Sequence, residues 1–119
     1  MITYLKLSKN VIEKVKNEAV SLVCETMGND VKKIILYGSC SRGDFSEDSD
    51  IDIALLTSCG RLEVKKYNNS LAEISTEFAE KYLAIVNFVC FPEKEFEEKK
   101  RWYPYFRNIE KEGEVLYGR

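Results

Sequence analysis

Apolar positions in the first quarter of the chain follow a helical period. Residues at this three- or four-residue spacing lie on one face of a helix. Gly28 follows the segment, and glycine readily adopts the left-handed conformation that ends helices. We therefore predict a helix over residues 10–27. Its apolar face comprises Val11, Ile12, Val15, Ala19, Leu22 and Val23.

Three compact apolar runs predict strands. Residues 33–37 form the first run, which ends abruptly at Gly38 and Ser39. Residues 50–57 alternate between polar and apolar side chains and then become apolar, and residues 83–91 are apolar almost throughout. Short apolar runs between turn residues are typical of strands. A continuously apolar strand is typical of a sheet's centre, so we expect residues 83–91 to be central.

The polar remainder predicts helices. Residues 61–82 carry apolar side chains at helical spacing. Pro92 and Pro104 can each open a helix, because proline is tolerated at the first helical position, and Gly113 would end the second one. Residues 115–117 then suit a short edge strand. This order predicts an α/β fold in which helices pack on a small mixed β-sheet. The apolar positions in residues 61–82 are Leu62, Val64, Leu71, Ile74, Phe78 and Tyr82.

Size and charge limit the classes of protein that the sequence can encode. The 119 residues suit one domain spanning residues 1–119. The net charge of −2 and the pI of about 5.3 lack the basic footprint of non-specific nucleic-acid binding. Residues 1–10 contain no long apolar run, so we expect neither a signal peptide nor a membrane span. We therefore expect a cytoplasmic protein.

Cysteine and histidine usage narrows the possible chemistry. The chain has no histidine, and its four cysteines form no closely spaced pair. Zinc sites and Ser-His or Cys-His catalysis are therefore not expected. Proton transfer would fall to carboxylates, lysine, tyrosine or water. We expect reduced thiols at Cys24, Cys40, Cys59 and Cys90.

A Gly-Ser pair follows the first predicted strand directly. After Gly38 and Ser39 the chain can enter a short helix, whose first backbone N–H groups are unpaired and suit an anion. Glycine allows a phosphate to approach the backbone closely, and the serine hydroxyl adds a donor. By itself such a pair is also typical of a simple turn.

Two aspartates begin the second predicted strand. Asp50 and Asp52 are two residues apart, so they share one face, whereas Ile51 and Ile53 point to the other face and into the core. Alone, this pattern is also typical of a solvated strand face. A divalent cation would relieve the repulsion between the carboxylates, and Mg²⁺ prefers carboxylate and phosphate oxygens. Together with the Gly-Ser turn, the pair provides what a magnesium-bound nucleoside triphosphate needs.

The combined motif resembles the signature of the minimal nucleotidyltransferases in the DNA polymerase β-like superfamily. The motif consists of Gly-Ser-Cys-Ser-Arg-Gly-Asp at residues 38–44 and Ser-Asp-Ile-Asp at residues 49–52. The end of the chain, from residue 108 onwards, also resembles these proteins. The resemblance implies a nucleotidyltransferase fold. It also implies transfer of a nucleoside monophosphate, AMP in particular, from a triphosphate such as ATP to a hydroxyl.

Residue roles follow from this resemblance. Gly38 and Ser39 would hold the triphosphate. Asp50 and Asp52 would be the catalytic pair and would bind both Mg²⁺ ions.

Two further motif residues have competing interpretations. Arg42 could neutralise phosphate charge, or it could pair with Asp44. Ser49 could contact a phosphate, although a turn residue is the favoured interpretation.

One position departs from the family pattern. Active members carry a third carboxylate on a neighbouring strand, where residues 83–91 place Asn87. Asparagine offers a metal a carbonyl oxygen but cannot take a proton at neutral pH. Glu93 and Glu95 could substitute, although both suit the first turn of a helix. An enzyme and a nucleotide-binding relative without turnover therefore both remain open.

The resemblance also suggests partners. Stand-alone members are often encoded beside a small all-helical HEPN-class protein, as toxin and antitoxin, and can attach AMP to a tyrosine of that partner. The aromatic residues Trp102, Tyr103, Tyr105 and Phe106 suit either such a contact or core packing. A small-molecule nucleotidyltransferase of the antibiotic-modifying type is a further alternative. In that case a homodimer could supply the acceptor-binding portion.

Overall fold

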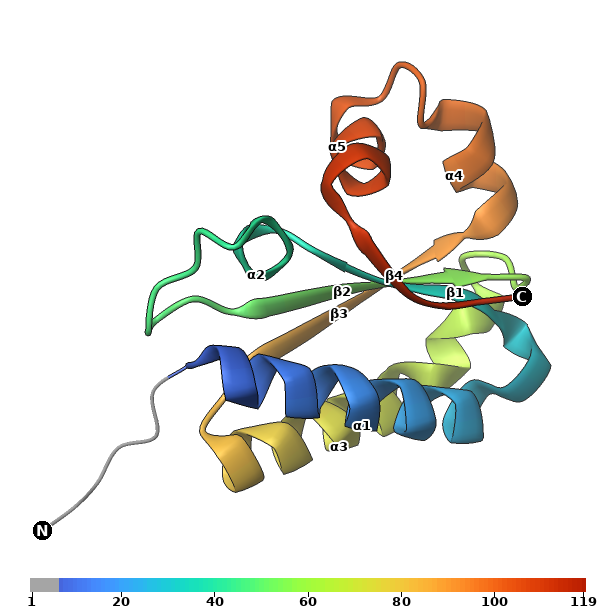
Figure 1. Cartoon of the computed structure of the whole chain (residues 1–119). Coiled ribbons are helices and arrows are strands. Elements are labelled where there is room, and N and C mark those ends of the chain that lie inside the picture. Colours follow the sequence, from blue (N-terminus) through green and yellow to red (C-terminus); the bar gives the residue numbers. More distant parts are fainter. Residues whose placement is uncertain (1–6) are drawn as a thin grey trace, which may run out of the picture.

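The computed structural model describes residues 7–119 (Figure 1). Expectations for residues 1–6 lie outside the described residues. No helix within residues 7–119 is long and apolar enough to cross a membrane. The strands are β1 (Val31–Tyr37), β2 (Ile51–Thr57), β3 (Val86–Pro92) and β4 (Glu114–Gly118). The helices are α1 (Lys9–Met27), α2 (Ser39–Arg42), α3 (Asn68–Tyr82), α4 (Glu93–Lys99) and α5 (Pro104–Glu112), with 3-10 turns η1 (Gly28–Asp30) and η2 (Glu63–Tyr67).

The four strands form one mixed sheet in the order β3-β2-β1-β4. β1 pairs antiparallel with both β2 and β4, whereas β2 and β3 are parallel. The predicted mixed α/β fold is therefore confirmed. The predicted central position of the third strand is wrong, because β3 lies at an edge. Its apolar composition has another cause: Phe88 and Cys90 pack against the core beneath the sheet, while Val89 and Phe91 pack against the core above it.

Helix α1 forms where the sequence predicted it. The Ser8 side chain accepts a hydrogen bond from the Val11 backbone N–H, at 3.2 Å, and so caps the first turn. Gly28 ends the helix with a φ of 55°, a conformation that favours glycine. Most of the predicted apolar stripe between these ends is buried against the sheet, whereas Leu22 is only partly buried.

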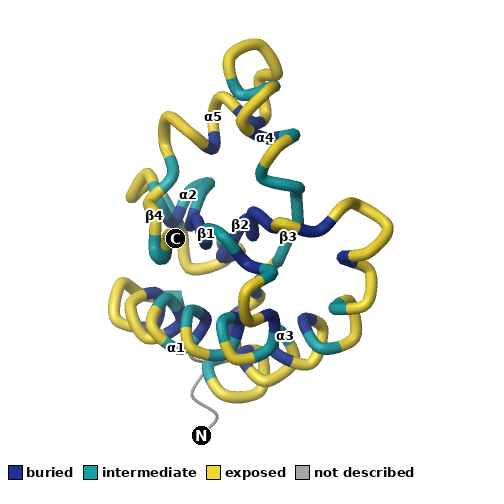
Figure 2. Tube along the Cα trace, turned by 90° about the vertical axis from the view of Figure 1, so that its right-hand side faces the viewer, coloured by how far each residue is buried: buried dark blue, intermediate teal, exposed yellow. Residues whose placement is uncertain are grey.

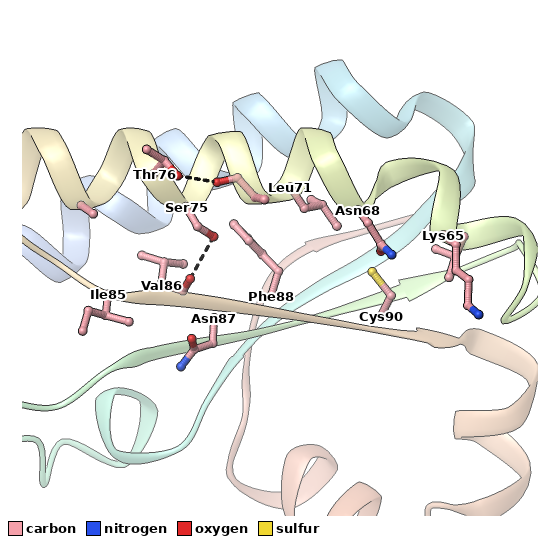
Figure 3. A pocket seen from close by; sticks show the side chains of 13 residues that line it. Lys65, Asn68, Leu71, Ser75, Thr76, Ile85, Val86, Asn87, Phe88 and Cys90 are labelled. Carbon is pink, nitrogen blue, oxygen red and sulfur yellow. Dashed lines mark hydrogen bonds between the residues drawn. The ribbon is translucent and has the colours of Figure 1, made fainter.

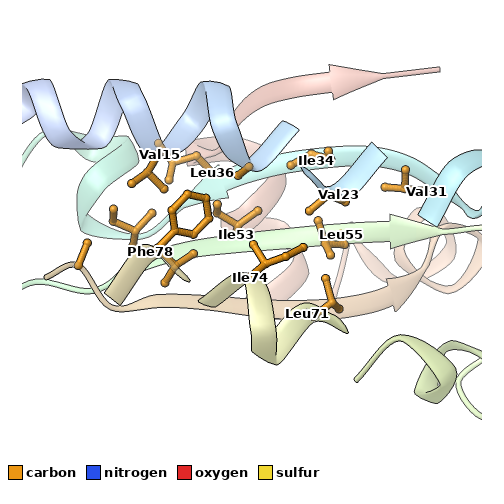
Figure 4. Packing of buried hydrophobic residues seen from close by; sticks show 14 of the residues in the cluster. Val15, Val23, Val31, Ile34, Leu36, Ile53, Leu55, Leu71, Ile74 and Phe78 are labelled. Carbon is orange, nitrogen blue, oxygen red and sulfur yellow. The ribbon is translucent and has the colours of Figure 1, made fainter. Parts of the chain in front are cut away.

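The larger core lies between the sheet and the helices α1 and α3 (Figures 1 and 4). Ile51, Ile53 and Leu55 enter it from β2, and all three side chains are fully buried. Val15 and Phe78 meet them from α1 and α3. This layer holds both long helices on one face of the sheet.

A smaller core lies on the opposite face, beneath α4 and α5 (Figure 1). Figure 2 shows buried segments in the strands and in parts of these two helices. Phe106 is buried there, whereas Trp102, Tyr103 and Tyr105 remain 64%, 41% and 39% exposed. Core packing therefore accounts for only one of the four aromatic residues. The buried residues of this core are Ile35, Ala54, Leu56, Phe96, Phe106 and Ile109.

Candidate functional site

Gly38 joins β1 to α2 in a conformation that requires glycine. Its φ is 78°, and a Cβ atom at this position would lie 2.8 Å from Oδ2 of Asp52. A side chain would therefore meet both backbone strain and a steric clash. The Gly38 carbonyl accepts the N–H groups of Ser41 and Arg42, each at 3.1 Å, which starts α2 at Ser39. The turn thus brings backbone into contact with a carboxylate of the next strand.

The two aspartates and Asn87 form one polar group. Asn87 Nδ2 donates to Asp50 Oδ2 at 3.1 Å and to Asp52 Oδ1 at 3.2 Å. Asp52 and Asn87 are register partners on the parallel strands β2 and β3. One amide reaches both carboxylates, so the aspartates share a face, as strand alternation predicted. The same alternation buries Ile51 and Ile53 on the opposite side.

This group has the donors for a partial magnesium shell. Mg²⁺ usually takes one or two protein carboxylates and completes its shell with water and substrate phosphates. Asp50 and Asp52 supply two carboxylates, and rotation of the Asn87 amide would present its carbonyl oxygen to the same place. Within the described residues, no group of three His, Cys, Asp or Glu side chains could hold a metal. A metal ion held by the two carboxylates would take its remaining ligands from water and from a bound triphosphate.

Tyr37 also belongs to this face, although the sequence pattern around it indicates only a strand residue. It is the register partner of Asp52 across β1 and β2. Its hydroxyl lies 2.8 Å from the Tyr105 hydroxyl of α5. Burial, helped by this hydrogen bond and by the Asp52 charge, raises the pKa of Tyr37, so the phenol stays protonated at neutral pH. Side chains two residues apart on a strand share a face. The burial of Ile35 on β1 could therefore have indicated that Tyr37 lies on this same face.

Other contacts fix the segments that carry the site. Cys40 Sγ donates to the Asp50 carbonyl at 3.5 Å. Ser41 Oγ donates to the Glu112 carbonyl at 2.6 Å, and Arg42 bonds the Glu112 carboxylate at 3.2 Å. These bonds tie α2 to the start of the aspartate segment and to the end of α5.

Three residues that the sequence suggested for the site form hydrogen bonds or ion pairs with neighbouring side chains or backbone groups. Arg42 Nε donates to Asp44 at 3.1 Å, as the pairing alternative predicted. The Ser49 hydroxyl accepts the Ser46 N–H at 2.9 Å, which is a turn contact. Glu95 pairs with Arg61 and Lys99, and these hydrogen bonds lower the pKa of Glu95 to about 2.

The structure therefore brings Gly38, Asp50, Asp52 and Asn87 together, with Ser39 beside Gly38 at the start of α2. Glu93 is the first residue of α4, and Glu95 accepts a hydrogen bond from Lys99 of the same helix.

The fold and this polar group define a small α/β protein of the nucleotidyltransferase type. Residues 12–117 match the family model described as a nucleotidyltransferase domain, and the chain belongs to that family. A curated relative from Methanocaldococcus jannaschii, whose name describes it as a protein adenylyltransferase, is 34% identical over 105 residues. The match covers 88% of this chain and 97% of the relative.

Solved structures share the fold. A toxin–antitoxin structure with AMP-PNP matches with a TM-score of 0.61 and 23% identity, covering 87% of this chain and 73% of the other. A Shewanella oneidensis structure, of a tri-AMPylated HEPN toxin in complex with an MNT antitoxin, matches with a TM-score of 0.57 and 20% identity. That match covers 90% of this chain and 72% of the other.

Proposed function

We propose that this protein transfers AMP from ATP to a hydroxyl of a partner protein and uses Mg²⁺. The observation that carries the proposal is the contact between the Gly38 turn and the aspartate pair, because it joins a phosphate-binding backbone to metal-binding carboxylates. Gly38 and Ser39 hold the triphosphate in this proposal, and Asp50 and Asp52 hold the metal. Mg²⁺ held by these aspartates would neutralise phosphate charge and help to orient the triphosphate.

The chemistry requires a hydroxyl oxygen in line with the α-phosphate. The new bond joins this oxygen to the α-phosphorus, the bond to the β-phosphate bridging oxygen breaks, and pyrophosphate leaves. Asn87 cannot accept the hydroxyl proton at neutral pH, so the proton passes to water or to an aspartate. Positioning and charge neutralisation therefore supply most of the catalysis, as is usual in transfer to phosphorus.

The names of the relatives indicate the acceptor. The M. jannaschii relative is named as a protein adenylyltransferase, and the Shewanella neighbour contains an AMPylated HEPN toxin. We assign this chain the corresponding role: an antitoxin-like enzyme that modifies a small all-helical HEPN-type partner. A hydroxyl-bearing small molecule of the antibiotic type is the competing acceptor, and the same assay compares the two.

The test is incorporation of labelled AMP. Purified protein is mixed with labelled ATP, Mg²⁺ and the co-expressed HEPN-type partner, and label on the partner is measured. The proposal expects label with the wild type, more label with Asn87→Asp, and none with Asp50→Ala/Asp52→Ala. Absence of label with both the wild type and Asn87→Asp would overturn it. Label on an antibiotic-type small molecule added to the same mixture, instead of on the partner, would overturn the assignment of a protein acceptor.

A second candidate function is neutralisation of the partner by binding alone. Two features favour it: Asn87 is an amide at the position where the family resemblance implies a third carboxylate, and Arg42 is already paired with Asp44 and Glu112. Under this alternative, the Asp50→Ala/Asp52→Ala protein still neutralises a toxic partner in cells. Loss of neutralisation by a double variant that remains folded and bound would show that the chemistry is required.

A further inference from the structure

A groove follows the outer side of β3 (Figure 3). Its volume is about 760 Å³, within the size range of ligand sites. One wall comes from η2 and α3, and the other from the segment Ile85–Cys90. Within residues 7–119, the outer side of β3 pairs with no other strand. Edge strands are normally protected by charges or bulges, but residues 86–92 contain no charged residue.

Helix α3 lies beside this edge without filling the space. Its groove-lining positions 72, 75, 76 and 79 follow helical spacing on one face, and all carry short side chains: Ala72, Ser75, Thr76 and Ala79. Ser75 Oγ donates to the Val86 carbonyl at 2.9 Å, which fixes the spacing between helix and strand. Short side chains therefore leave room along the strand.

The backbone of β3 presents hydrogen-bonding groups to the groove. The Ile85 carbonyl accepts the Ile51 N–H at 2.8 Å and so points toward β2. The Val86 carbonyl points the other way, toward Ser75. Because successive peptide groups alternate along a strand, Phe88 and Cys90 direct their N–H and C=O groups outward as Val86 does. The Val86 carbonyl already accepts the Ser75 hydroxyl, so the groups of Phe88 and Cys90 are the ones that suit the backbone of an extended segment.

A strand added here would reach both faces of the sheet. Figure 3 shows Val86 and Phe88 pointing toward α3, whereas Asn87 points to the opposite side. Side chains of an added strand alternate in the same way. Every second side chain would enter the groove, and the others would lie beside Asn87, on the face that holds Asp50 and Asp52.

Strand spacing also indicates which acceptor side chain fits. Neighbouring strands lie about 4.8 Å apart, so a residue opposite Asn87 would have its backbone about 10 Å from that of Asp52. A tyrosine carries its hydroxyl far enough from its backbone to approach the carboxylates, whereas serine does not. Leu83 and Ile85, 56% and 59% exposed, add apolar surface at this end of β3.

We propose that the groove along β3 binds the acceptor segment of the partner protein as an added strand. The segment alternates apolar side chains, which enter the groove, with a tyrosine that points to the Asp50–Asp52 face. This inference rests on the proposed function and adds the place and conformation of the acceptor.

Two synthetic peptides test the alternation. In Lys-Val-Thr-Val-Tyr-Val-Thr-Lys, the tyrosine lies on the face opposite the valines. In the control, Lys-Val-Thr-Tyr-Thr-Val-Thr-Lys, it shares the valine face. Amide hydrogen exchange of the full chain is measured with each peptide, and AMP transfer to each is measured with Mg²⁺ and ATP. We expect slower exchange at Phe88 and Cys90 with either peptide, and AMP on the first peptide alone.

Matched variants test whether the peptide binds in this groove and not on another surface. Ala72→Trp/Ala79→Trp fills the groove from exposed helix positions, and Ser21→Trp adds the same side chain to the exposed surface of α1. We expect the first variant to weaken binding of the first peptide at least tenfold, with unchanged ATP binding. The Ser21 variant should behave as the wild type does.

Several results would overturn the proposal. These are unchanged exchange at Phe88 and Cys90 with millimolar peptide, equal AMP transfer to both peptides, or undiminished binding by the filled groove. Exchange that slows with protein concentration alone would assign the edge to a second copy of the chain. Protection at β3 without AMP transfer to either peptide or to the partner would support the docking surface and count against the proposed function.

Discussion

The two faces of β2 differ sharply, although they come from the same seven residues. Ile51, Ile53 and Leu55 are fully buried on the face covered by α1 and α3. On the other face, α4 and α5 cover the later part of the strand, and Asp52 remains partly exposed beyond them. Burial in the core explains why the residues on the covered face are apolar. The carboxylate lies where the core does not reach, so the fold does not require it and function explains it better.

The largest expected effect on stability comes from the covered face. Leu55→Ala removes a fully buried side chain and should cost about 2–5 kcal/mol of the free energy of unfolding. Asp52→Ala should cost far less and can be neutral, because it removes one of two neighbouring negative charges. Urea unfolding of both variants checks the contrast. Equal losses would mean that Asp52 is a structural residue.

Gly38→Ala tests the contact between the turn and the aspartate pair. A left-handed φ and a 2.8 Å approach to Asp52 both oppose a side chain, and such backbone strain costs about 1–3 kcal/mol. We expect this loss in thermal unfolding, together with weaker ATP binding. Gly43→Ala is a matched control, because its φ is also positive, at 84°, but no atom lies within 4 Å of its added Cβ. Equal effects on ATP binding would contradict a special role for Gly38.

The amide of Asn87 allows a further test of the difference between the two faces of β2. Asn87→Asp replaces a donor to both carboxylates by a third negative charge, so without metal it should destabilise the fold by about 1 kcal/mol. Mg²⁺ should restore this loss, because a cation reverses the sign of the interaction. Thermal unfolding with EDTA and with Mg²⁺ measures both effects. Asn87→Ala provides the control, since it should lose the hydrogen bonds without gaining a metal response.

The smallest expected effect lies in α4, away from the site. Hydrogen bonds from Arg61 and Lys99 lower the pKa of Glu95 from 4.5 to about 2. Because the folded-state pKa is lowered, this stabilisation is present above pH 4.5 and is lost as the pH falls toward 2. Glu95→Gln should therefore reduce the acid dependence of stability in this range. Unfolding from pH 6 to pH 2.5 checks this, with Glu98→Gln on the same helix as control.

Sequence periodicity predicted the order of the long helices and the strands, because most apolar stripes meet a covering layer. The helix predicted over residues 61–82 is an exception, since it is divided into η2 and α3, and Leu62 from its predicted apolar face is 79% exposed. The failure of periodicity at β3 is informative. A strand can be apolar at an edge when separate cores lie above and below it, and sequence alone does not show those cores. The site motif also came from local sequence, since Gly38 to Asp52 is one short segment. Contacts that join distant segments, such as Tyr37 with Tyr105 and Arg42 with Glu112, depend on where α5 packs.

We propose that the Gly38 turn and the Asp50–Asp52 pair together bind a magnesium-bound triphosphate. Isothermal titration with ATP tests it most directly, in Mg²⁺ and in EDTA, with the wild type and with Asp50→Ala/Asp52→Ala. We predict tight binding only for the wild type with Mg²⁺, and a double variant that remains folded by circular dichroism. Equal binding with and without Mg²⁺, or unchanged binding by the double variant, would contradict it.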